Sequence, residues 1–309
     1  MNVPPPDRNL IEEVALIKGI SPSFAEKDWY VTQVIKIVSE ISFRNFQIIF
    51  TGGTSLSKAY RLLQRFSEDI DFRVIVPDLK NESKSKQRKI LSEFKEAVTD
   101  VLQKTSGIAM ESIFARSGNQ FMAFEITYPA YYSPETALRP HILVEFTVSD
   151  LVLPASQLPI SSLVNEVSKK MPEIERIGCT DIVENTCDKL SAITWRIPDR
   201  VRGEEKDDPA IVRHIHDLAI LGDLALQHPD FKKLAIGTIA CDDQRSEKIA
   251  GLSIQEKFAT VFNILVEDKE YIQEYNRFVK GMSYAPDNTL PSFEQAMEKL
   301  RKLINTILK

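Results

Sequence analysis

The sequence predicts an α+β fold, in which a mixed sheet with flanking helices is followed by a C-terminal helical domain. Short apolar runs with strand-like alternation occupy the first half of the chain, whereas apolar residues in 229–309 recur at helical spacing. Between residues 47 and 73 an apolar run, a turn, an amphipathic helix and a second apolar run follow one another. Proline-punctuated and then helical sequence begins after Ser149, so we expect domains at 1–155 and 156–309.

Length and composition indicate a folded protein of the cytoplasm without a membrane anchor. The chain has 309 residues, 43% of them hydrophobic and 27% charged, and its three cysteines lack CxxC spacing. It has no run of eighteen apolar residues, and its N-terminus lacks the apolar core of a signal peptide. The net charge of −5 argues against a protein that coats nucleic acid without specificity.

The first domain is expected to alternate helices and strands, and the second to contain helices alone. A Ser21-Pro22 step separates the first two helices. In the first domain we expect helices at 8–19, 23–41 and 90–103, and strands at 47–50, 108–115, 120–128 and 141–147. In the second we expect helices at 161–169, 181–198, 209–221, 229–236, 253–267, 269–280 and 292–308.

The glycine pair Gly52-Gly53 opens the most informative stretch of the chain. Thr54 suits the N-cap of the following helix, because its hydroxyl can accept from free N–H groups of the first turn. Adjacent glycines allow a bulky anion to approach the backbone, and a helix N-terminus offers unpaired donors. These three residues are therefore candidate nucleotide-phosphate ligands, with an ordinary turn as the alternative. Lys58, one turn later, is a further phosphate candidate or else a solvent-facing lysine.

Asp69 and Asp71 stand two residues apart on the second apolar run. On a strand their Cα atoms lie about 6.6–7 Å apart on one face, while Ile70 and Phe72 face the core. Two such carboxylates repel each other unless a cation lies between them, and Mg²⁺, or Mn²⁺ in its place, prefers oxygen ligands. They are candidate metal ligands, with two solvated surface aspartates as the alternative.

Glu145 is the acidic residue of the predicted strand HILVEFT. A carboxylate in such an apolar run is costly unless it is paired or binds metal. We expect it to complete the metal shell or to act as the catalytic base. The alternative is an edge-strand glutamate that faces water.

The segments GGTSLSKAY and RFSEDIDF resemble the AbiEii/AbiGii toxin family. This family is a branch of the nucleotidyltransferase fold related to the DNA polymerase β superfamily, so the resemblance implies that fold for the sheet domain. Superfamily enzymes commonly carry a third carboxylate on a strand beside the Asp-x-Asp strand, which supports Glu145. Fifteen residues separate Gly53 from Asp69, a longer spacing than in many members.

Two later segments resemble further motifs of the same family. DIVENTCDKLSAI resembles a motif whose lysine contacts the nucleotide, which implies that role for Lys189. RHIHDL resembles the RH-x-x-D-L motif, so Asp217 is expected to orient Lys189 or Arg213 in the active site. The alternatives are a lysine at the protein surface and an ordinary intrahelical ion pair. His214 and His216 point away from each other on a helix, which excludes a zinc pair.

The resemblance implies transfer of a nucleotide monophosphate from an NTP to an acceptor such as the 3′ end of tRNA, with release of pyrophosphate. Family members resemble toxins of toxin–antitoxin and phage-defence systems, whose antitoxin is encoded nearby and does not bind stably. Two alternatives remain open: a nucleotidyltransferase-like module that binds without catalysis, and an enzyme that modifies a small molecule such as an aminoglycoside.

Overall fold

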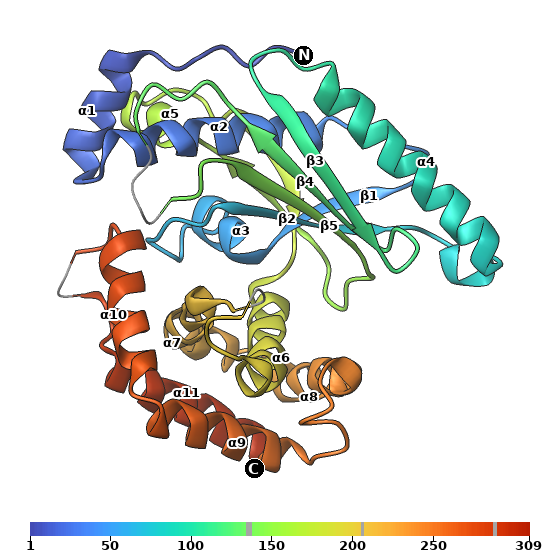
Figure 1. Ribbon diagram of the computed structural model, residues 1–309, viewed down its shortest axis with the longest axis vertical. Helices are drawn as coiled ribbons and strands as arrows, with labels where there is room; N and C mark the ends of the chain where they lie inside the picture. Colours follow the sequence, from blue (N-terminus) through green and yellow to red (C-terminus); the bar gives the residue numbers. More distant parts are fainter. Residues whose placement is uncertain (134–137, 205–206, 287–288) are drawn as a thin grey trace. The chain divides into compact units, whose positions relative to one another are not determined.

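The computed structural model describes residues 1–133, 138–204, 207–286 and 289–309 (Figure 1). The chain divides into two compact units, Met1–Thr180 and Asp181–Lys309. The predicted boundary after residue 155 falls inside the first unit, because two strands that follow it complete the sheet.

The first unit is built on a seven-stranded mixed sheet with flanking helices, as predicted. Its strand order is β3-β4-β5-β2-β1-β7-β6. β2 pairs with β5 and β1 with β7 in parallel, whereas the other neighbours are antiparallel. The strands are β1 Gln47–Thr51, β2 Asp69–Ile75, β3 Ala109–Arg116, β4 Phe121–Thr127, β5 Ile142–Val148, β6 Ser156–Ile160 and β7 Ile174–Cys179.

Two long helices cover the apolar face of this sheet (Figure 1). α2 (Pro22–Ser39) and α4 (Lys84–Gln103) pack their buried residues against a core that includes Phe72 and Phe146 of the two central parallel strands. The remaining helices of the unit are α1 Arg8–Lys18, α3 Gly52–Lys58 and α5 Leu163–Val167. The apolar residues of β2 and β5 therefore face these helices, and their polar residues project from the opposite face.

The sequence analysis missed β6 and β7. Pro159 lies within β6, which is tolerated because β6 is one of the two edge strands of the sheet. In β7 the residues Glu175 and Arg176 are both exposed, so the strand lacks strict alternation. Neither segment has the local pattern by which strands are recognised. Pairing with β1 holds β7 in the sheet, and pairing with β7 holds β6 there.

The second unit is helical, as predicted. Its helices are α6 Ile182–Asp199, α7 Val212–Ala225, α8 Phe231–Cys241, α9 Ile254–Glu267, α10 Glu270–Met282 and α11 Phe293–Leu308. α6 packs against α7 and α8, and α11 packs against α7. Within the described ranges, no helix combines the length and the apolar character needed to cross a bilayer.

Candidate active site

Three carboxylates project from one face of two neighbouring strands in the first unit. Along β2 the half-buried Asp69 and Asp71 alternate with buried apolar residues, so both aspartates lie on the face opposite the core. β5 runs parallel to β2, and their register places Glu145 directly beside Asp71. Sequence alternation predicted the shared face of the aspartates; the pairing of β2 with β5 adds the third carboxylate.

The Glu145 carboxyl is strongly influenced by its neighbours. Burial raises its pKa above the ordinary value, and the negative charge of Asp69 raises it further. A hydrogen bond with Asp71 and the positive charges of Arg116 and Arg139 act in the opposite direction. Glu145 therefore binds a proton more readily than an exposed glutamate does, which suits a group that must accept one near neutral pH.

Gly52 brings the backbone of the turn against the carboxylates. It has a φ of +76°, and a methyl group added there would overlap Asp71 Oδ2 and lie 2.9 Å from its Cγ. A side chain at the adjacent Gly53 would meet the Arg65 guanidinium at 2.8 Å and Ser67 Oγ at 2.9 Å. Glycine is thus required at position 52 by conformation and by close approach. The predicted turn and the predicted carboxylates do lie together.

Thr54 has a different role from the predicted one. α3 begins at Gly52 and its N-cap is Thr51, so the prediction of Thr54 as N-cap is wrong. The Thr54 side chain is buried, and its hydroxyl donates to the backbone carbonyl of Asp69. The positive φ of Gly52 allows the chain to turn directly from β1 into α3, which places Thr54 inside the first turn. Thr54 therefore ties α3 to the start of β2.

Arg139 is a member of this site that the sequence analysis missed. Its guanidinium Nη1 lies 2.8 Å from Asp69 Oδ1. Its backbone is held on both sides: the amide donates to Glu68 Oε1 at 2.7 Å, and the carbonyl accepts from Lys27 Nζ at 2.7 Å. Lys27 also pairs with Glu68. Because Arg139 stands outside any periodic segment, no local sequence signal could have indicated it.

The three carboxylates are of the chemical type that binds a hard divalent cation, although they do not form a ready metal site. Asp69, Asp71 and Glu145 offer carboxylate oxygens from one face of adjacent strands, which is the ligand type that Mg²⁺ prefers. Across the described part of the chain, however, no three His, Cys, Asp or Glu side chains form a ready ligand group. One of the three carboxylates, that of Asp69, is instead paired with the Arg139 guanidinium.

Lys58 is held by partners on other elements of the first unit. Its Nζ lies 2.5 Å from Asp28 Oδ1 and 3.4 Å from the carbonyl oxygen of Ser161. The other carboxylate oxygen of Asp28 accepts from the Leu163 amide at 2.7 Å. This lysine links α3 to α2 and to the start of α5, so it has a structural role and is not a solvent-facing lysine.

The second unit holds Lys189 and Asp217 in a buried ion pair. Lys189 Nζ on α6 lies 2.8 Å from Asp217 Oδ2 on α7, and the Asp217 side chain is fully buried. His216 Nδ1 lies 3.4 Å from the other Asp217 oxygen. Of the two partners predicted for Asp217, the structure selects Lys189, because Arg213 pairs with Asp208 instead.

His214 lies in the same buried region and is neutral. Burial lowers the pKa of its imidazole well below the ordinary value, and the positive charges of Lys189, Arg213 and Arg196 contribute. Its Nε2 lies 3.3 Å from Arg196 Nη1. Lys189 is buried, and the positive charges of Arg196 and Arg213 lie near His214 beside it, which favours an anionic partner such as Asp217.

Comparison with known proteins gives results for both sequence and structure. Residues 38–299 match the family model described as "Nucleotidyl transferase AbiEii toxin, Type IV TA system". The fold is similar to that of MenT4, a nucleotidyltransferase toxin of Mycobacterium tuberculosis H37Rv. The TM-score is 0.50 and the sequence identity 17%, over 96% of this chain and 99% of that one. No curated protein matches the sequence.

Proposed function

Because the chain belongs to the AbiEii family of nucleotidyltransferase toxins, we propose that it transfers a nucleotide monophosphate from an NTP to the 3′ end of an RNA, most simply a tRNA. Type IV toxins act within a two-component system, so a cognate antitoxin completes the pair, and we propose that it does not bind stably. The reaction would take place in the cytoplasm, where NTPs and tRNA are available.

One observation carries this proposal: Asp71 and Glu145 stand side by side on parallel strands, against a glycine that leaves no room for a side chain. Two carboxylates on directly paired residues repel each other, and this repulsion favours a bound cation. Asp69 and Asp71 would hold a Mg²⁺ or Mn²⁺ ion, with Glu145 beside it as the base of the reaction. When bound, such an ion supplies positive charge to the transferred phosphoryl group and the leaving pyrophosphate.

Other residues of the site would bind the triphosphate and accept the proton of the acceptor. Gly52 and Gly53 would hold the triphosphate through backbone donors, and Thr54 would fix the turn to β2. In the transfer step the 3′ oxygen of the acceptor bonds to the α-phosphorus while the bond to the leaving pyrophosphate breaks. The raised pKa of Glu145 suits it to take the proton of the acceptor hydroxyl on a carboxylate oxygen.

Three cationic side chains would contribute to phosphate binding in different ways. Arg139 neutralises Asp69 in the absence of metal and would turn to the nucleotide phosphates once a metal ion takes its place. The family resemblance supports phosphate binding by Lys189, with Asp217 setting the position of its ammonium group. Lys58, whose ammonium group is paired with Asp28, would act through the fold.

Radiolabelled transfer would test this proposal. The purified protein is incubated with total RNA, Mg²⁺ and each of the four α-labelled NTPs in turn, and the labelled RNA is identified. We expect one or two NTPs to label a small RNA in the parent and none to do so in Asp69→Ala or Asp71→Ala of unchanged melting temperature. Labelling by either variant at the parental rate would refute the metal assignment.

A further inference from the structure

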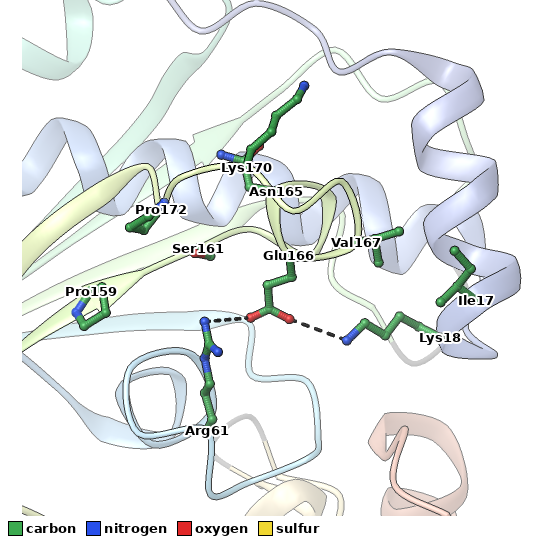
Figure 2. Close-up of a pocket in the computed structure, with 10 residues that line it drawn as sticks. All are labelled: Ile17, Lys18, Arg61, Pro159, Ser161, Asn165, Glu166, Val167, Lys170 and Pro172. Atoms are coloured by element: carbon green, nitrogen blue, oxygen red, sulfur yellow. Dashed lines mark hydrogen bonds and ion pairs between the residues drawn. The ribbon is translucent and has the colours of Figure 1, made fainter.

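A pocket of about 550 Å³ lies in the first unit, on elements that the proposed chemistry does not use (Figure 2). The end of α1, the segment after α3, and α5 with its flanking residues line it. Ile17, Val167, Pro159 and Pro172 form apolar walls. The pocket is thus large enough for one nucleotide unit and offers surfaces for a sugar or a base.

Charged side chains give the pocket a positive excess. Lys18, Arg61 and Lys170 stand against one carboxylate, Glu166, so the lining carries 3 − 1 = +2 on a chain of net charge −5. Figure 2 shows the Glu166 side chain between Arg61 and Lys18, while Lys170 points away from it. Lys18 and Arg61 therefore both point toward the same carboxylate at the pocket.

The two ion pairs of Glu166 are weak enough to be exchanged. Its oxygens lie 3.5 Å from Lys18 Nζ and 3.4 Å from Arg61 Nη2, and the Arg61 side chain is 60% exposed. Long, exposed ion pairs contribute little to stability. A phosphate, by contrast, can accept two parallel hydrogen bonds from a guanidinium. A phosphodiester would therefore compete well with Glu166 for both cations.

The position of Arg61 relates the pocket to the carboxylates through α3. Gly52 at the start of α3 touches Asp71, and Arg61 follows the C-terminal end of the same helix at Lys58. Seven helical residues at about 1.5 Å each span about 10 Å. Stacked nucleotides rise by about 3.4 Å along a strand. Three further residues of at most about 3.6 Å each lead from Lys58 to Arg61, so the Cα atoms of Gly52 and Arg61 lie no more than about 21 Å apart. A strand of a few nucleotides with its 3′ end at the carboxylates can span that distance.

We propose that this pocket binds the acceptor RNA a few nucleotides upstream of its 3′ end, with Lys18 and Arg61 on a backbone phosphate. The proposal rests on the proposed function for its choice of ligand. The combination of cations with apolar walls fits a nucleotide unit of a strand better than a free inorganic anion. The pocket would hold the acceptor in place while the glycine turn holds the NTP.

RNA binding without catalysis tests this proposal. A fluorescent RNA hairpin with a single-stranded 3′ tail is titrated without NTP or metal, at several salt concentrations. We expect Lys18→Ala and Arg61→Ala each to weaken binding about three- to tenfold. The double variant of Lys18→Ala with Arg61→Ala should also reduce the slope of log affinity against log salt by about 0.7, the value for one lost phosphate contact on a single strand. Lys86→Ala, which also removes an exposed, ion-paired lysine, serves as the matched control and should bind as the parent does.

The direction in which Glu166→Gln changes RNA affinity shows whether the pocket binds RNA or whether its ion pairs only support the fold. Removing the competing carboxylate should tighten RNA binding about two- to fivefold, whereas a purely structural salt-bridge cluster would lose affinity in all three variants. Melting temperatures identify any variant that fails to fold. If Arg61→Ala does not fold, Arg61→Lys is used in its place. Arg61→Lys retains the positive charge and should lose part of the RNA affinity.

The outcomes for the pocket and for the proposed enzyme are distinct. If the parent labels RNA and all pocket variants bind RNA as the parent does, the pocket proposal is overturned and the enzyme stands. A second outcome is that the parent labels no RNA, while RNA binding falls in Lys18→Ala and Arg61→Ala and rises in Glu166→Gln. In that case the pocket proposal stands and the transfer proposal fails. A polyglutamate peptide that binds the parent as tightly as RNA and is lost in the same variants would assign the pocket to acidic peptides and overturn its RNA role.

Discussion

Arg139 lies 2.8 Å from Asp69, and this ion pair occupies the carboxylate that a catalytic metal ion would need. The Arg139 backbone is fixed through Glu68 and Lys27, so the guanidinium is presented to the site by a rigid anchor. A metal ion bound here would compete with the Arg139 guanidinium for the carboxylate oxygens of Asp69. Metal binding must therefore displace Arg139 or share Asp69 with it.

Replacing Arg139 by alanine should strengthen metal binding in the absence of nucleotide. Loss of the competing guanidinium increases the net negative charge around Asp69. Both side chains are partly exposed, so the gain should be modest, about 0.5–1 kcal/mol or roughly two- to fivefold in Mn²⁺ affinity. Isothermal titration with Mn²⁺ measures this change. The KM for NTP should rise in the same variant, because a phosphate partner is lost.

Arg139→Lys is the control for charge without the planar fork of the guanidinium, and its metal affinity should lie between those of parent and alanine variant. Unchanged Mn²⁺ affinity in Arg139→Ala would show that the arginine does not compete with the metal. A higher Mn²⁺ affinity with an unchanged KM for NTP would show that it competes but does not contact the nucleotide.

Gly52→Ala should damage the site more than it damages the fold. A left-handed φ costs a non-glycine residue about 1–2 kcal/mol, and the added methyl group would push the Asp71 carboxylate aside. A displacement of about 1 Å at a catalytic group can cost about 100-fold in rate. Transfer activity and the free energy of unfolding measure the two effects separately.

Gly251→Ala is a matched control for this change. Gly251 has a φ of +75°, but a methyl group there meets no atom within 4 Å. This variant should lose the same conformational free energy and keep full activity. Equal activity losses in the two variants would mean that Gly52 matters only for folding.

The sequence predicted the central part of this site because local patterns control it. Alternation along β2 assigned Asp69 and Asp71 to one face, and the glycine pair marked the turn from β1. The neighbour relation between β2 and β5 is a long-range pairing, which the apolar pattern of HILVEFT permits but does not specify. The side-by-side position of Glu145 and Asp71 could therefore be expected only through the family resemblance.

Other features depend on tertiary contacts that leave no local pattern. Arg139 reaches Asp69 from a loop, and Lys58 finds Asp28 on a helix about thirty residues earlier in the chain. Thr54 looked like an N-cap because its residue type is right, yet the left-handed Gly52 starts the helix two residues earlier. In each case the identity of the side chain was informative, whereas its partner was set by packing.

Glu145→Gln should stabilise the protein at neutral pH and not at acidic pH. The folded state raises the pKa of this carboxyl above its ordinary value of 4.5. Its folded-state contribution is therefore most favourable below pH 4.5 and is lost as the pH rises through the raised pKa. Glutamine carries no charge at any pH and avoids this loss. Melting temperatures of parent and variant should agree at pH 4 and separate in favour of the variant at pH 7.

The same substitution should abolish transfer, since glutamine cannot accept the proton of the acceptor hydroxyl. Parental activity should fall as the pH is lowered and Glu145 takes up a proton, and a metal ion bound beside Glu145 would bring its pKa below the metal-free value. Asp150→Asn, which neutralises an exposed carboxylate elsewhere in the unit, should leave both the pH profile and the melting curves unchanged. A parental pH profile in Glu145→Gln would exclude this residue as the base.

The buried pair of Lys189 and Asp217 allows structure and phosphate binding to be separated. Lys189→Met should destabilise the second unit by about 3–5 kcal/mol, because it leaves the fully buried Asp217 without its ammonium partner. The double variant Lys189→Met with Asp217→Asn removes both charges and should recover most of that stability. If Lys189 binds phosphate, both variants should bind a fluorescent NTP analogue at least tenfold more weakly than the parent. Chemical denaturation and the NTP titration report these two quantities independently. A stable double variant with parental nucleotide affinity would assign the pair to folding alone.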